Sequence, residues 1–284
     1  MAKKVIDMRS RPAFLHDFYG ATPGTNEYEV VKWLNRRVGS KDDEHFTRSK
    51  TVEGFVEEIR EVGITASVVV GRDIPGIRHT NDEISGITKG HKELVGMGSV
   101  DPLALGVKGS IAEIERAIKK LGLKGINLEP GFGSAPMKAD NPLLYPIYDA
   151  CDQLGVPVCL MSGPTSPSLD LTDPAPVGRI AKAFPGLSII CYHGFYPYVN
   201  EVIGVAFRWE NVFLVPDMYI FLPGGSLYVE AANGFMKDQL LFGSSYPFRA
   251  MGQSVEDYRN LGFKDDVIEQ VMYKNAKRVL KLKA

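Results

Sequence analysis

Short apolar runs alternate with amphipathic helical patterns along the chain, and this alternation restricts the fold more than any other feature. Most of the runs are apolar or β-branched throughout, as expected for parallel strands covered on both faces. We predict eight strands, at residues 4–8, 66–70, 94–100, 125–128, 156–161, 188–192, 212–215 and 240–242. Eight β/α pairs in 284 residues predict an α/β fold, a single-domain (β/α)₈ TIM barrel over residues 1–284.

The competing fold is an open, doubly wound parallel sheet. Such a sheet usually carries a glycine-rich phosphate-binding loop after its first strand. Here the first predicted strand runs instead into Met-Arg-Ser-Arg-Pro at residues 8–12. The closed barrel is therefore favoured.

Residues 12–50 interrupt the alternation, because they separate the first strand from the first clear helix by far more than a usual βα connection. A flexible linker is not expected, since the segment is rich in aromatic residues: Phe14, Phe18, Tyr19, Tyr28, Trp33 and Phe46. We predict an insertion that either covers the barrel mouth as a lid or forms a subunit contact.

The charge balance excludes several classes of partner. Lys and Arg number 33 against 34 Asp and Glu, for a net charge of −1, which argues against a nucleic-acid or anionic-membrane surface. The sequence has no apolar run near the ~20 residues that span a bilayer, and its first residues do not resemble a secretory signal. Three cysteines without a CxxC pair suit a reducing compartment, so we expect a cytoplasmic protein.

Catalytic groups of such a barrel lie at the C-terminal ends of its strands. Arg9 and Arg11 follow the first strand and are two residues apart, so they face the same way on an extended chain. At ~6 Å and an effective dielectric constant of ~20 they repel by roughly 3 kcal/mol, which a carboxylate or a bound anion must offset. We predict that both arginines bind a small anionic substrate, and the other predicted substrate-binding residues are Arg72, Tyr219 and Tyr246. In the structural alternative, Asp7 pairs with Arg9 and Arg11 is exposed.

His193, Glu129 and Asp217 are the candidate catalytic residues. His193 is the only histidine at a predicted strand end, and Gly194 follows it, which favours a general base or a ligand over a core histidine. Glu129 follows the fourth strand and is either an acid/base or a carboxylate that neutralises an arginine. Asp217 follows Pro216, and because proline rarely continues a strand, the sequence does not fix the residue at which the seventh strand ends.

Several motifs, in order and spacing, resemble the amidohydrolase-related family that includes aminocarboxymuconate-semialdehyde decarboxylase and dicarboxylate lactonases. They include Gly-Ile-Asn-Leu-Glu-Pro at residues 125–130, His-Gly at 193–194 and Leu-Phe-Gly-Ser-Ser-Tyr-Pro at 241–247. The resemblance covers nearly the whole chain and supports the barrel. It implies an enzyme, often a homo-oligomer, that acts on small carboxylated or ring-derived compounds.

The metal site of that family does not carry over. Arg9 and Arg11 stand at the positions of its first-strand His-x-His pair, while Met161 and Ser245 replace a histidine and an aspartate. Arginine has no lone pair to offer a cation, so we expect no metal cofactor. The alternative is one divalent ion, Mn²⁺ or Zn²⁺, in a displaced site made by Glu129, His193 and Asp217.

The resemblance and the strand-end residues together predict a hydrolase of a small anionic or cyclic carbonyl compound, which cleaves a lactone or a carbon–carbon bond. In this hypothesis the arginines orient the substrate, and His193 or Glu129 transfers the proton. Two alternatives stay open: a decarboxylase or hydratase that uses the displaced metal, and a non-catalytic protein that binds a small molecule.

Overall fold

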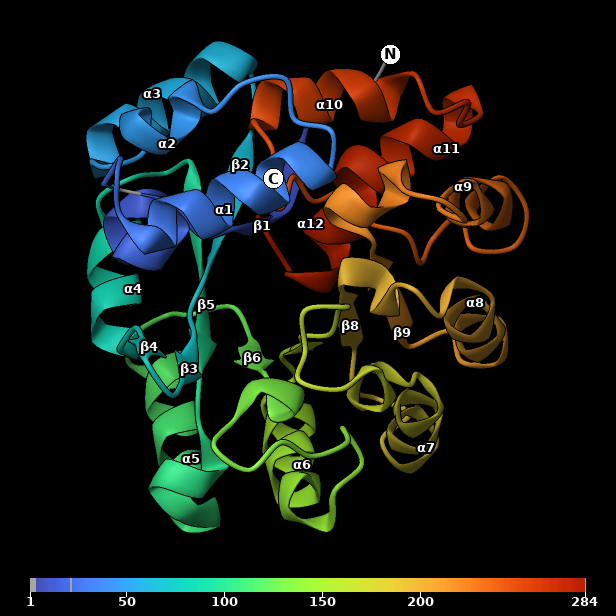
Figure 1. Ribbon diagram of the computed structural model, residues 1–284. Coiled ribbons are helices and arrows are strands. Elements are labelled where there is room, and N and C mark those ends of the chain that lie inside the picture. Colours follow the sequence, from blue (N-terminus) through green and yellow to red (C-terminus); the bar gives the residue numbers. More distant parts are fainter. Residues whose placement is uncertain (1–3, 21, 284) are drawn as a thin grey trace.

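The computed structural model describes residues 4–20 and 22–283. Seven parallel strands form one sheet in the order β1-β2-β5-β6-β7-β8-β9, and Figure 1 shows them at the centre of a ring of helices. The strands are β1 (Ile6–Ser10), β2 (Ala66–Val70), β5 (Leu94–Ser99), β6 (Ile126–Leu128), β7 (Val158–Leu160), β8 (Ile189–Tyr192) and β9 (Val212–Val215). The predicted TIM barrel is confirmed.

The eighth predicted strand, residues 240–242, is extended and lies between the first and last strands of the sheet. The amide of Leu241 donates to the carbonyl of Leu214 at 2.9 Å, and the amide of Met8 donates to the carbonyl of Phe242 at 3.0 Å. Isolated bridges join Leu240 to Leu214 and Tyr246 to Ser10. This segment therefore completes the ring between β9 and β1, although its ladder is too short to form a regular strand.

Helices cover the outside of the barrel and bury their apolar stripes against the strands. Phe55 and Ile59 of α3 and Ile114 of α5 belong to this outer core, whereas Val68 and Ile190 pack inside the barrel. The helices are α3 (Val52–Val62), α4 (Asn81–Lys89), α5 (Pro102–Lys119), α6 (Tyr145–Leu154), α7 (Ala175–Ala183), α8 (Val199–Arg208), α9 (Ser226–Asn233), α10 (Met251–Arg259), α11 (Asp265–Glu269) and α12 (Asn275–Val279). Among the described residues, none of the helices is long and apolar enough to cross a membrane.

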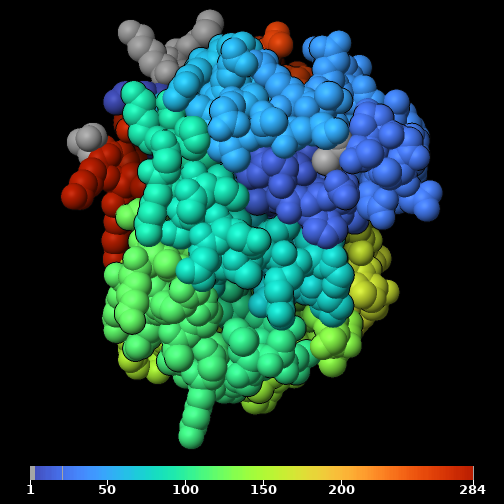
Figure 2. All heavy atoms as spheres, turned by 90° about the vertical axis from the view of Figure 1, so that its left-hand side faces the viewer, coloured from blue at the N-terminus to red at the C-terminus, as the bar shows by residue number. Residues whose placement is uncertain are grey.

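The described part of the inserted segment, residues 12–20 and 22–50, forms short 3₁₀ turns followed by α1 (Asn26–Arg37) and α2 (Glu44–Arg48). Tyr28, Val31 and Phe46 of this segment pack in one buried cluster with Met218 and Phe248, which follow strand ends of the barrel. In Figure 2 the dark blue part of the segment lies on the side of the molecule opposite the red C-terminal residues. The segment therefore lies over the C-terminal ends of the strands.

A second sheet, of two strands, lies beside the C-terminal ends of the barrel strands and was not predicted from the sequence. It is an antiparallel hairpin of β3 (Asp73–Ile74) and β4 (Ile77–Arg78) in the connection that follows β2. Gly76, in the turn between the two strands, has φ of 82°, a left-handed conformation that favours glycine. The hairpin adds Ile74 and Ile77 to the wall of the site described next.

Candidate active site

A cavity of about 250 Å³ opens at the C-terminal ends of the strands. Of the predicted site residues, Arg9, Arg11, Arg72, His193 and Tyr219 line it. Aromatic side chains form much of the remaining wall. The segment over the mouth contributes Phe18, Tyr19 and Trp33, and the connections after other strand ends contribute Phe132 and Phe248. The cavity is thus a mostly apolar space with a few cationic groups and one imidazole.

Glu129 follows β6 and is held by two guanidinium groups. Arg11 Nη2 donates to its Oε1, and Arg72 Nε donates to its Oε2 at 2.8 Å. The side-chain amide of Asn127 also donates to Oε1, at 3.0 Å. Arg11 reaches this position because its Nε donates to the carbonyl of Val70, at 3.2 Å, across the neighbouring strand. One buried carboxylate therefore compensates two buried cations.

This pairing favours one of the two roles considered for Glu129. Burial alone would raise the pKa of its carboxyl group, but Arg11 and Arg72 lower the pKa to about 2. A carboxylate that ionises so readily and has both oxygens occupied is a poor proton donor or acceptor near neutral pH. The geometry favours the neutralising carboxylate over the acid/base.

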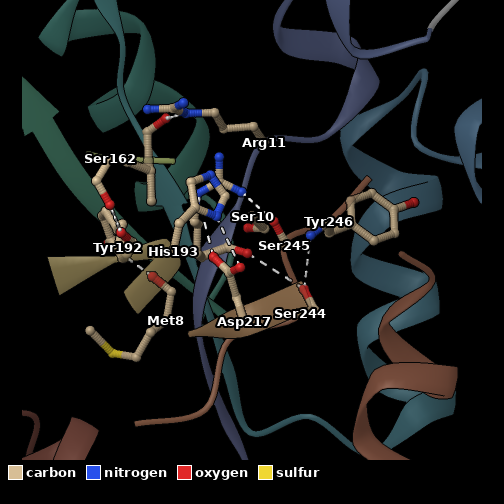
Figure 3. A network of polar contacts seen from close by, with 12 residues as sticks. Met8, Ser10, Arg11, Ser162, Tyr192, His193, Asp217, Ser244, Ser245 and Tyr246 are labelled. Carbon is tan, nitrogen blue, oxygen red and sulfur yellow. Dashed lines mark hydrogen bonds and ion pairs between the residues drawn. The ribbon is translucent and has the colours of Figure 1, made fainter. Parts of the chain in front are cut away.

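His193 and Asp217 form a buried pair at the ends of β8 and β9. His193 Nδ1 lies 2.9 Å from Asp217 Oδ1, and Figure 3 shows the two side chains facing each other. With Nδ1–H donating to the carboxylate, Nε2 is the nitrogen left for a ligand. Burial lowers the pKa of His193, Asp217 opposes the shift and Arg9 adds to it, so the imidazole is neutral at pH 7.

Tyr219 holds the imidazole ring from the side. Its ring centroid lies 4.9 Å from that of His193, edge to face, and its other neighbour, Tyr196, stacks on it at 5.0 Å. Both contacts restrict the ring positions. Tyr219 therefore supports His193 and forms part of the cavity wall.

Of the three arginines that line the cavity, Arg9 has the weakest charge compensation. Its Nη1 donates to Ser245 Oγ at 2.7 Å. Its Nε is buried without a hydrogen-bond partner and lies 4.0 Å from Asp217 Oδ2, which is also buried and unpartnered. Burial is the largest cause that lowers the pKa of Arg9, and the positive charge of Arg11 is the second. An anion bound in the cavity would raise this pKa again. Arg9 is thus placed to bind an anion.

The structural alternative for Arg9, in β1, and for Arg11, just after it, is wrong on both counts. Asp7 accepts hydrogen bonds from the backbone amide of Arg9 at 3.1 Å and from the amide of Ser244 at 2.8 Å, so it does not neutralise the Arg9 side chain. Burial raises the pKa of Asp7 to about 6. Arg11, predicted there as exposed, has only 1% of its surface accessible.

Left-handed backbone conformations gather at three of the strand ends that form the site. His193, Asp217 and Ser245 have φ of 59°, 43° and 62°. Such values are uncommon for residues other than glycine and cluster at functional sites, where surrounding contacts hold them. Surrounding contacts therefore hold the backbone of these three residues in a conformation that sets the direction of their side chains.

The position expected for Tyr246 is contradicted by the structure. Its ring points away from His193 and Asp217 in Figure 3, and its hydroxyl oxygen lies within hydrogen-bond distance, 2.8 Å, of both Glu58 Oε2 and the carbonyl oxygen of His45. Ser245, the residue before Tyr246, has φ of 62°, a left-handed backbone conformation that a sequence pattern does not reveal. Tyr246 anchors α2 and α3 and does not line the cavity.

The residues present do not fit a divalent ion. The positions where the resemblance implies metal ligands are occupied by Arg9, Arg11, Met161 and Ser245. Arg9 donates a hydrogen bond to Ser245. The displaced site is not assembled either, because Glu129 is held by Arg11 and Arg72. Across residues 4–20 and 22–283 there is no group of three or more His, Cys, Asp and Glu side chains arranged to hold a metal.

Enzymes with a parallel (β/α)₈ barrel carry their active sites at the C-terminal ends of the strands, where the polar groups of this chain lie. The family model described as Amidohydrolase matches residues 44–282. The chain belongs to this family of enzymes.

Similar proteins agree with this assignment. An uncharacterized TIM-barrel protein from Bordetella bronchiseptica is 32% identical, with 98% of each chain covered and a TM-score of 0.89. A 2-amino-3-carboxymuconate-6-semialdehyde decarboxylase from Dictyostelium discoideum is 34% identical over 82 residues, which cover 28% of this chain and 22% of that protein. A 2,6-dihydroxybenzoate decarboxylase from Rhizobium shares the fold at 15% identity, with 100% of each chain covered and a TM-score of 0.70.

The sequence interpretation missed the roles of two residues. Asn127 of β6 supports Glu129, and its position two residues before Glu129 in an extended stretch is a signal for a side chain on the same face. Tyr19 lines the cavity from the inserted segment, whose aromatic content is the only sequence signal for it.

Proposed function

We propose that this protein is a decarboxylase of a small, hydroxylated ring carboxylate, and that Arg9 supplies the positive charge a metal ion supplies elsewhere in the family. One observation carries the proposal: the incompletely paired Arg9 and the neutral His193 of the His193–Asp217 pair line the same cavity. A guanidinium binds a carboxylate well, and an imidazole with a free nitrogen moves a proton.

The size and wall of the cavity support a substrate with a single ring. A cavity of ~150 Å³ holds benzene, so about 250 Å³ leaves room for one ring with small substituents. Phe18, Phe132 and Phe248 offer flat apolar faces for such a ring. The 2,6-dihydroxybenzoate decarboxylase from Rhizobium acts, by its name, on a compound of this kind.

The proton steps follow from the neutral imidazole. His193 Nε2 takes the proton of a ring hydroxyl, and Asp217 stabilises the imidazolium that forms. The imidazolium returns this proton to the ring carbon that bears the carboxylate. The bond to the carboxylate then breaks, its electron pair stays in the ring, and CO₂ leaves. One proton from solvent restores the hydroxyl, so the balance is one proton consumed per CO₂ released.

Arg9 binds the carboxylate and orients its carbon over His193. Because Arg11 and Arg72 share the charge of Glu129, they maintain a positive potential at the strand ends without a mobile ion. We therefore propose that turnover needs no divalent cation. A homo-oligomeric state and a cytoplasmic location remain predictions.

Hydrolysis of a lactone is the second candidate. The observation in its favour is the same pair, since a neutral histidine oriented by a carboxylate also removes a proton from water. Arg9 would then stabilise the oxyanion that forms at the ring carbonyl.

Product analysis on chelator-treated protein separates these possibilities. The assay measures CO₂ release from hydroxybenzoates and ring opening of cyclic lactones, before and after treatment with a chelator. We expect CO₂ release at the same rate in both preparations. A rate that collapses on chelation and returns with Mn²⁺ or Zn²⁺ would refute the role of Arg9. Ring opening without CO₂ would establish the hydrolase, and no turnover of either class would favour a binding protein.

A further inference from the structure

Tyr19 carries a buried hydroxyl that has no hydrogen-bond partner among the described residues. The side chain is fully buried and lines the same cavity as Arg9 and His193. A buried hydroxyl is nearly always hydrogen-bonded in a folded protein, because leaving it unpaired sacrifices its interaction with water. The missing partner of Tyr19 is therefore expected inside the cavity.

The inserted segment fixes the position of this ring. Tyr19 ends a 3₁₀ turn (Asp17–Tyr19), and its ring contacts Phe18 at 5.4 Å and His79 at 6.0 Å between centroids. Gly20 follows with φ of 91°, and a Cβ there would lie 3.1 Å from the ring of Phe46. Backbone and ring are thus confined from several sides, so the hydroxyl has a defined place.

Two guanidinium groups surround that place. Arg72 lies close to the hydroxyl, but no hydrogen bond of acceptable geometry links them. Arg9 is also within electrostatic range of Tyr19. Both arginines line the cavity, and Glu129 already occupies Arg72 Nε. An anionic oxygen beside Arg9 would therefore be within reach of a neutral donor as well as a cation.

We infer that Tyr19 is a substrate-binding residue, which donates its hydroxyl to the carboxylate that Arg9 neutralises. The inference rests on the proposed function, since it requires an anionic substrate in this cavity. It assigns a binding role to the segment over the barrel mouth, whose Tyr19 completes a site that the strand ends alone leave open on one side.

Tyr19→Phe removes the hydroxyl and keeps the ring, so it tests the inference directly. Tyr28→Phe is the matched control in the same segment, because the Tyr28 hydroxyl contacts Asp43, at 3.4 Å, instead of the cavity. Binding of benzoate, 2-hydroxybenzoate and 2,6-dihydroxybenzoate is measured by isothermal titration calorimetry on the whole protein. Thermal unfolding without ligand is recorded for each variant, and Arg9→Met is included as a third variant.

We expect Tyr19→Phe to weaken binding of the carboxylates that the wild-type protein binds by roughly 10-fold, within the range of one hydrogen bond to a charged group. Its unfolding temperature should equal or exceed that of the wild type, because the hydroxyl has no partner to lose. Tyr28→Phe should bind as the wild type does.

The outcomes distinguish a failure of the role assigned to Tyr19 from a failure of the proposed function. Unchanged affinity in Tyr19→Phe, with binding lost in Arg9→Met, overturns the role of Tyr19 and leaves the proposed function standing. A lower unfolding temperature with unchanged affinity shows a purely structural hydroxyl and also overturns it. Undiminished binding in Arg9→Met, or no binding of any of the carboxylates to the wild type, overturns the proposed function and the inference together.

Discussion

Replacing Glu129 with Gln tests whether this residue compensates the two arginines or transfers a proton. The substitution keeps the size of the side chain and removes its charge, which leaves Arg11 and Arg72 buried without a carboxylate. Breaking a buried ion pair by removing one partner typically costs about 3–5 kcal/mol. We therefore expect a large loss in the free energy of unfolding at pH 7.

The lowered pKa of Glu129 gives a second estimate of how much its carboxylate stabilises the folded protein. The pKa of Glu129 falls from 4.5 to about 2 on folding, and at 1.36 kcal/mol per unit this corresponds to about 3 kcal/mol. Because the folded pKa is the lower one, this stabilisation is present above pH 4.5 and is lost as the pH falls toward 2. By this linkage about 2 kcal/mol of it disappears between pH 7 and pH 3.

The assay is urea unfolding of the wild type and Glu129→Gln at pH 7 and at pH 3, followed by circular dichroism. Glu269→Gln is the control, because the carboxylate of Glu269 pairs with Lys274 at an exposed site, where such pairs contribute about 0–1 kcal/mol. The stability gap between wild type and Glu129→Gln should narrow by about 2 kcal/mol at pH 3. A variant that is as stable as the wild type at both pH values but inactive would refute the reasoning and restore Glu129 as an acid/base.

Four further outcomes follow from the site. His193→Asn should reduce turnover by roughly 10²-fold or more with the fold retained by circular dichroism, and a near-normal rate would remove the proton-transfer role. Since burial lowers the pKa of His193, kcat/KM should persist below pH 6.5 and decline only as the imidazole is protonated at lower pH; a decline centred above 6.5 in a pH–rate profile would contradict this. Arg9→Met should raise the KM for carboxylate substrates by about 10-fold or more, and an unaltered KM in steady-state assays would exclude Arg9 from binding. Asp217→Asn should lower kcat and leave the binding of benzoate by calorimetry nearly unchanged, whereas equal loss of both would mean that Asp217 acts on Arg9 and not on His193.

The sequence predicted more of the barrel than of the contacts within the site. Strand positions followed from local hydrophobic runs, and the observed strands lie within the predicted ranges or extend them by two residues, as β1 does at Ser10. The hairpin of β3 and β4 was missed, because two-residue strands carry no recognisable period. The eighth strand was expected as regular, but its pairing depends on how the ends of the sheet meet.

Within the site, the residue types at the strand ends predicted which charged groups gather there, but not which carboxylate pairs with which cation or imidazole. The mutual repulsion of Arg9 and Arg11 required a compensating anion, and the sequence left several carboxylates open. Only the folded chain shows that Glu129 serves Arg11 and Arg72, while Asp217 serves His193. Strand ends separated by more than a hundred residues meet at the barrel mouth, and their distances follow from the sheet register.

The amino-acid sequence by itself determined the parallel barrel and the end of it where polar residues gather. It also shows Arg9, Arg11 and Ser245 at positions where the family resemblance implies metal ligands. The barrel follows from periodicity, and the poor ligand capacity of arginine follows from its lack of a lone pair, which are local properties. The tertiary structure decided that Tyr246 points outward and that Tyr19 lies against the cavity. Those outcomes depend on one left-handed residue at Ser245 and on the folding of residues 12–50 across the strand ends, because a side chain's direction is set by the backbone and neighbours that hold it.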